Sequence, residues 1–142
     1  MAVASCLAGL AFTRAGVGYV HAISHQLGGL YHVPHGLINA IVLPHVLEFS
    51  KVNCANRLAD LARVSGIGQH GASDTDLADA FIAHIRALNS AMQIPTAVKG
   101  LRPSDFETII DRAFKEAHGT YGVPRYLSRS QARALLGKML AA

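Results

Sequence analysis

Charged side chains are nearly absent from the first 50 residues, where Arg14 and Glu48 are the only Lys, Arg, Asp or Glu. Over all 142 residues, 15% are charged and 51% are hydrophobic. So apolar a composition excludes an intrinsically disordered protein, and a chain of this length can bury one core. We therefore predict a single domain over residues 1–142, with surplus apolar surface in residues 1–50.

Cysteine is also scarce. Cys6 and Cys54 are the only two, and they form no CxxC pair. This usage indicates a reducing, cytoplasmic location and predicts that both thiols lie in the core. The apolar start of the chain has no basic residues before it, which excludes a typical signal peptide. At about 12 residues it is too short to span a bilayer, so we predict no membrane partner.

No basic run is interleaved with aromatic residues, although the formal net charge is +4 and the pI is near 9.4. The basic residues of the second half alternate with four acids, Asp105, Glu107, Asp111 and Glu116. We interpret these mixed charges as solvated helix faces, and we predict no nucleic-acid partner.

Alternating strand patterns are lacking as well, whereas helical periodicity recurs. An apolar stripe at helical spacing runs from Leu77 to Met92. Two capping boxes, Ser104 with Glu107 and Ser128 with Gln131, predict two further helix starts. With the segments 3–13, 17–27 (stopped by two glycines), 36–49 (kinked at a proline) and 57–64, the sequence predicts an all-α bundle of about seven helices.

Histidine, in contrast, is concentrated in one apolar segment. Residues 16–39 hold four of the chain's eight histidines: His21, His25, His32 and His35. Imidazole is the commonest metal ligand and titrates near neutral pH. The cluster predicts a metal or proton-transfer site, with packed core histidines as the alternative. The other four, His45, His70, His84 and His118, are expected to have no role in a site.

The spacing of these histidines leaves two pairings open. His21 and His25 share one face of a helix. His21 and His35 would be about 21 Å apart on a continuous helix, too far for metal bonds of about 2.1 Å. A chain reversal between Gly28 and Pro34 would bring them together. The residues therefore permit His21 to pair with either His25 or His35.

The segment GVGYVHAISHQLGGLYHVPHGLINAIVLPHVLEF resembles the signature of the iron-containing (group III) alcohol dehydrogenases, G-x-x-H-A-x-x-H-x-L-G-G-x-Y-x-x-P-H-G-x-x-N-A-x-x-L-P. The segment Ala8 to Phe12 and the later Ile94-Pro95 and Pro124 to Ser128 are also similar to that family. The matched signature positions are Gly18, His21, Ala22, His25, Leu27, Gly28, Gly29, Tyr31, Pro34, His35, Gly36, Asn39, Ala40, Leu43 and Pro44.

This resemblance implies the helical C-terminal domain of an enzyme that also has an α/β nucleotide-binding domain. Such enzymes interconvert small alcohols and aldehydes with NAD(P), using Fe2+ or Zn2+ as a Lewis acid held by one Asp and three His. By position, the resemblance implies that His21 and His35 are metal ligands. It implies for His25 a place beside the nicotinamide, as a catalytic proton-transfer or positioning group, or as a packed histidine that braces the metal helix.

Two parts of the family pattern are missing from the chain. It contains no Gly-rich GGGS string, and no histidine has an aspartate four positions before it. We therefore identify no cofactor-binding residues and expect this chain alone neither to bind NAD(P) nor to be active. Three interpretations follow. The chain is a C-terminal piece of a dehydrogenase, or it completes an enzyme with a separate N-terminal chain that docks on residues 1–50. In the third, it is a standalone helical oligomer that acts as a scaffold, with a vestigial or histidine-only metal site.

Overall fold

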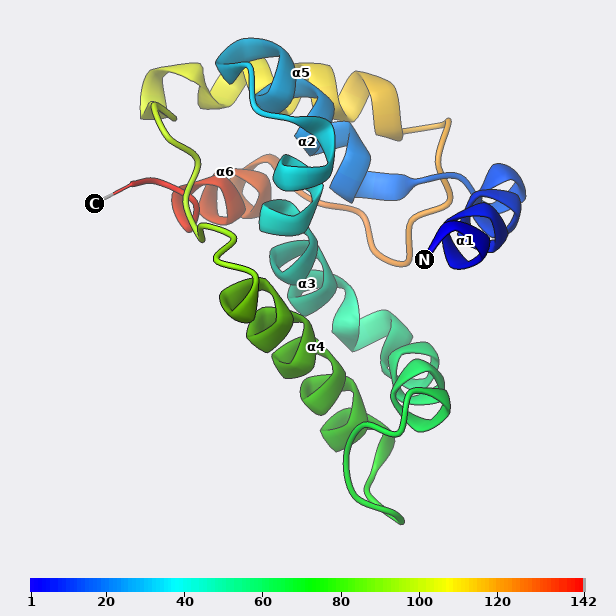
Figure 1. Ribbon diagram of the computed structural model, residues 1–142. Coiled ribbons are helices and arrows are strands. Elements are labelled where there is room, and N and C mark those ends of the chain that lie inside the picture. The colour runs from blue at the N-terminus through cyan, green and yellow to red at the C-terminus, as the bar shows by residue number, and fades with distance from the viewer. Residues whose placement is uncertain (142) are drawn as a thin grey trace.

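The computed structural model describes residues 1–141, and these form six α-helices and no named strand (Figure 1). The helices are α1 (Ala2–Ala15), α2 (Gly18–Tyr31), α3 (His35–Val64), α4 (Asp74–Ala91), α5 (Phe106–Ala117) and α6 (Arg129–Gly137). A short 3-10 turn, η1 (Pro103–Asp105), precedes α5. The all-α prediction is confirmed.

The helix number differs from the prediction because segments 36–49 and 57–64 belong to one long helix, α3. Its backbone leaves helical geometry at Cys54 (φ −141, ψ 23). The prediction of a kink at Pro44 is therefore wrong, because the break lies at Cys54. Pro44 lacks an N–H, so the Ala40 carbonyl one turn earlier loses its intrahelical donor. The Asn89 side chain of α4 replaces that donor at 2.8 Å.

Two other predicted helix boundaries are wrong. Helix α2 runs through Gly28 and ends at Tyr31, and His32 takes the left-handed conformation (φ 53). Ser104 does not cap α5. Its hydroxyl instead donates to the carboxylate of its neighbour Asp105, because the chain enters the helix through η1. The capping box of Ser128 and Gln131 is confirmed at the start of α6.

The main core lies where α2, α5, α6 and the first half of α3 meet. Its fully buried side chains include Leu27, Ile38, Ile109, Leu136 and Met139. Two smaller apolar clusters join the second half of α3 to α4, and these two helices run side by side away from the main core (Figure 1). Helix α3 therefore connects both parts of the molecule.

Helix α1 lies at the edge of the molecule (Figure 1) and has no buried residue. Leu7 and Leu10 are 61% and 68% exposed. Cys6 is exposed on the same helix, so the prediction that it lies in the core is wrong. Across residues 1–141, no single helix has the length and apolarity to cross a membrane. Helices α1 and α2 meet those criteria only together, and they are bent by 104° at the break between them.

Candidate functional site

The turn between α2 and α3 brings three of the clustered histidines together. The ring centroid of His21 lies 5.7 Å from that of His25 and 5.1 Å from that of His35. The rings of His25 and His35 are stacked at 5.3 Å. The chain does reverse between Gly28 and Pro34, so His21 meets both of its possible partners. His32 is exposed in the turn itself.

Gly28 permits this close approach of α2 and the turn. A Cβ atom at Gly28 would lie 3.3 Å from the Val33 carbonyl oxygen and 3.8 Å from Ile38 Cγ2. The first contact is tighter than ordinary van der Waals packing, so a larger residue would push the turn away. Helix α3 then starts at His35, directly after Pro34 (φ −54, ψ 137), which is compatible with the fixed φ of proline.

Asn39 lies between the two histidines that match metal ligands in the family signature. Its Nδ2 is 3.2 Å from His21 Nε2 and 3.0 Å from His35 Nε2. An amide nitrogen has two N–H donors and no acceptor, so both imidazoles carry their proton on Nδ1 when both bonds form. The two Nε2 lone pairs then converge on one point, as two ligands of one metal ion must.

His21 is held in the neutral form that a metal ligand requires. Burial lowers its pKa below the ordinary value, and the neighbouring rings of His35 and His25 lower it further. The carbonyl of Val17, one turn earlier, opposes this shift. That contact lacks ordinary hydrogen-bond geometry, since Nδ1 of His21 is buried with no hydrogen-bond partner.

Glu116 of α5 provides the carboxylate that the sequence around the cluster lacks. Its Oε1 lies 2.8 Å from His25 Nδ1 and accepts a hydrogen bond from the Tyr121 hydroxyl at 3.0 Å. Its Oε2 accepts from the Gln26 amide at 3.1 Å. Burial and this carboxylate together raise the pKa of Tyr121. The arrangement fixes the imidazole of His25, whose side chain is 42% exposed, toward His21 and His35.

Sequence reasoning missed Glu116 and gave Asn39 no role. Glu116 was interpreted as part of a solvated helix face, which is wrong because its side chain is only 25% exposed and meets residues of α2. The separation of 91 residues between His25 and Glu116 leaves no local signal for their contact. Asn39 could have been found, since it lies one helical turn after His35 on the same face.

A hollow of about 330 Å³ adjoins the histidine cluster. His21 and Asn39 contribute its polar wall, and the side chains of Phe12, Val20 and Leu43 contribute apolar walls. A space of this kind accepts a small molecule whose polar end faces His21 and whose body is apolar.

The residues fit part of a metal site. Among residues 1–141, no group of three or more His, Cys, Asp or Glu side chains is placed to hold a metal ion. His21 and His35 offer two converging lone pairs, whereas a stable zinc site takes at least three protein ligands. A complete metal site would therefore need ligands in addition to these two.

Residues 1–140 match the family model described as Fe-containing alcohol dehydrogenase family, C-terminal. The chain is 42% identical over 120 residues to 1,3-propanediol dehydrogenase of Klebsiella pneumoniae. This match covers 83% of this chain and 31% of that protein. It is 34% identical over 140 residues to NADPH-dependent butanol dehydrogenase of Clostridium saccharobutylicum. This second match covers 95% of this chain and 36% of that protein. The chain thus spans about a third of the length of these relatives.

Solved structures agree with these sequence matches. The crystal structure of a 1,3-propanediol oxidoreductase superposes with a TM-score of 0.88 at 37% identity, over 96% of this chain and 36% of that one. An alcohol dehydrogenase from Oenococcus oeni superposes with a TM-score of 0.85 at 35% identity, over 94% of this chain and 35% of that one. The chain therefore belongs to the Fe-containing alcohol dehydrogenase family and corresponds to its C-terminal, helical part.

Proposed function

We propose that this chain supplies the histidine half of the metal centre of an NAD(P)-dependent alcohol dehydrogenase. His21 and His35 would hold Fe2+ or Zn2+ through Nε2, and His25, oriented by Glu116, would move a proton near the substrate oxygen. The observation that carries the proposal is the convergence of the two Nε2 atoms on the single nitrogen of Asn39. When bound, the cation supplies Lewis-acid stabilisation of negative charge on the substrate oxygen.

The chain's own residues have separate tasks in this proposal. The apolar walls of Phe12, Val20 and Leu43 exclude water from one side of His21 and favour a small alcohol or aldehyde. Glu116 keeps His25 facing the other two rings. Nicotinamide binding and the remaining metal ligands are assigned to a nucleotide-binding part that lies outside this chain.

A chimera tests the enzymatic role. Residues 1–140 of this chain would replace the matching C-terminal part of the Klebsiella pneumoniae 1,3-propanediol dehydrogenase. We expect NAD(P)-dependent oxidation of a small alcohol, which falls at least about a hundredfold in His35→Ala. His84→Ala is the matched control, since His84 is exposed on α4, and it should keep the rate. A rate unchanged by both His21→Ala and His35→Ala would contradict the proposal.

Metal binding by the chain alone tests the ligand assignment separately. Elemental analysis after oxygen-free exposure to Fe(II) or Zn(II) should find weak binding, because only two ligands converge. His21→Ala and His35→Ala should abolish it, whereas His70→Ala should not. Retention of the metal in both of the first two variants would place it elsewhere.

A second candidate function is favoured by one observation, the exposure of the apolar side chains of α1. In that alternative, α1 mediates self-association of a helical scaffold, and the histidines form a vestigial or histidine-only site. An inactive chimera together with a stable oligomer of the isolated chain would support it.

A further inference from the structure

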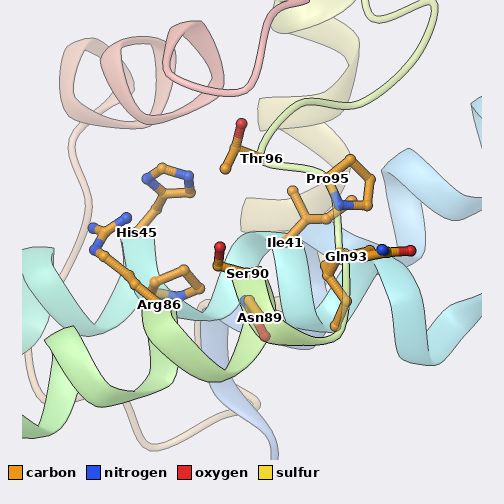
Figure 2. A pocket seen from close by; sticks show the side chains of 10 residues that line it. Ile41, His45, Arg86, Asn89, Ser90, Gln93, Pro95 and Thr96 are labelled. Carbon is orange, nitrogen blue, oxygen red and sulfur yellow. The ribbon is translucent and has the colours of Figure 1, made fainter.

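A second cavity, away from the histidine cluster, lies between α3, α4 and the segment that follows α4 (Figure 2). Its volume is about 290 Å³, and it shares no residue with the cluster of His21, His25 and His35. Helix α3 contributes Ile41 and His45, and α4 contributes Arg86 and Ser90. The volume is close to the lower end of small-molecule sites, roughly 300 Å³.

The two long walls of this cavity are joined by a specific contact. Pro44 lines the cavity and leaves the Ala40 carbonyl without its helical donor. Asn89 of α4 donates to that carbonyl at 2.8 Å. The bond satisfies a group that would otherwise lack a partner and holds α4 at a set position against α3. The cavity therefore belongs to the packed structure and does not lie in a loose loop.

Arg86 is the only Lys, Arg, Asp or Glu side chain among the residues that line this cavity. Arg86 makes no hydrogen bond or ion pair with any residue from 1 to 141. His45 lies beside it (Figure 2), and its Nδ1 is buried without a hydrogen-bond partner. Burial, then the charges of Arg86 and Lys138, lower the pKa of His45. A guanidinium without a counter-charge favours an anionic occupant.

One residue that lines the cavity, Gln93, has a backbone conformation that is unusual for a residue other than glycine. Gln93 has φ 57, in the left-handed region that normally takes glycine at a helix end. Its N–H donates to the Ser90 carbonyl at 3.0 Å, and the N–H of Ile94 donates to the Asn89 carbonyl at 2.9 Å. A glutamine here costs stability but places an amide at the cavity, and such strain is concentrated at functional sites.

The carboxylate that shares a neighbouring hollow with His45 already has a cationic partner. Glu48 lies in a neighbouring hollow that it shares with His45 and Lys138. It is paired with Lys51 at 3.1 Å, and Lys51 also pairs with Asp79. Arg86 therefore remains available to a ligand from solution.

We propose that this cavity binds a small organic anion. Its carboxylate or phosphate would pair with Arg86 beside the His45 ring, and its apolar body would lie against Ile41 and Pro95. A guanidinium suits both groups, since its N–H donors match their paired oxygens. Ser90, one helical turn after Arg86 on α4, and Thr96, in the segment after α4, add hydroxyls to the lining (Figure 2).

The test is a titration followed by two-dimensional NMR of the labelled chain with phenyl phosphate, benzoate and, as the uncharged comparison, benzyl alcohol. We expect both anions to shift the amide signals of Ser90, Gln93 and Thr96, with benzyl alcohol at least about tenfold weaker. Stronger binding of phenyl phosphate assigns a phosphate ligand, and stronger binding of benzoate assigns a carboxylate ligand.

Arg86→Gln should weaken anion binding about tenfold, the loss expected for one charge-assisted hydrogen bond. Arg112→Gln is the matched control, because it removes the same charge from α5, which does not line the cavity. Circular dichroism checks that each variant folds. If Arg86→Gln does not fold, the same titration of His45→Gln provides a second test. Equal anion affinity in parent and variant, or no shift at the three amides, would overturn the proposal.

Discussion

The carboxylate of Glu116 serves three neighbours, His25, Gln26 and Tyr121, and this single side chain joins α5 to the histidine cluster on α2. At the same scale, Asn39 joins His21 to His35. Each contact involves a charged or strongly polar group that is only partly exposed to water. Polar groups of this kind gathered at one place are markers of a candidate functional site.

His45 gives a pH-dependent prediction at the residue scale. Its pKa in the folded chain lies below the unfolded value of about 6.5, through burial and the charges of Arg86 and Lys138. Its contribution to stability is thus complete above about pH 6.5 and is lost as the pH falls through the folded pKa. Urea denaturation should show that the free energy of unfolding falls less between pH 7 and pH 5 in His45→Gln than in the parent.

His84→Gln is the control for this experiment, because His84 is exposed on the adjacent helix. It should leave the pH dependence of the parent unchanged. The pKa of His21 is also lowered. In every variant, His21 therefore still contributes to the change in the free energy of unfolding with pH. An identical slope in parent and His45→Gln would contradict the assigned burial of His45.

At the scale of elements, α3 and α4 are held together by two small apolar clusters and by the bond from Asn89 to the Ala40 carbonyl. The bond exists because Pro44 has no N–H to give that carbonyl. The donor, Asn89, lies on α4, which begins about ten residues after the end of α3 and is joined to it by a loop. The sequence predicted α4, and it predicted α3 as two separate helices, but it carried no information on this link.

A double-mutant cycle measures the link. Asn89→Ala should destabilise the parent by about 1–2 kcal/mol, the cost of leaving a carbonyl unpaired. In the Pro44→Ala background, the new N–H of residue 44 can pair with Ala40, so the same change should cost about 1 kcal/mol less. Urea denaturation of the four proteins gives the coupling. Equal costs in both backgrounds would show that Asn89 does not replace the missing donor.

At the scale of the whole molecule, one main core joins α2, α5, α6 and the first half of α3, and α1 remains outside it. A helix of 14 residues is marginal in water by itself. Val3, Leu7, Leu10 and Phe12 are 48–74% exposed along it. Four exposed apolar side chains on one short helix favour its association with another apolar surface.

We predict that the isolated chain self-associates through α1. The double variant Leu7→Glu/Leu10→Glu should shift the sedimentation profile toward monomer, because charges on an apolar contact oppose its burial. The matched control Leu61→Glu/Leu88→Glu changes two leucines that are 47% and 46% exposed on α3 and α4. Its profile should remain that of the parent. A monomeric parent would contradict the prediction.

The sequence by itself determined the helical class, most helix positions and the family, because local periodicity and an unbroken signature need no knowledge of distant contacts. It also singled out His21, His25 and His35. Only the tertiary structure decided that Glu116 reaches His25, that Asn39 joins the other two rings, and that α3 continues through Pro44 to Cys54. These contacts depend on how helices pack, and packing is set by the whole core and not by any one segment.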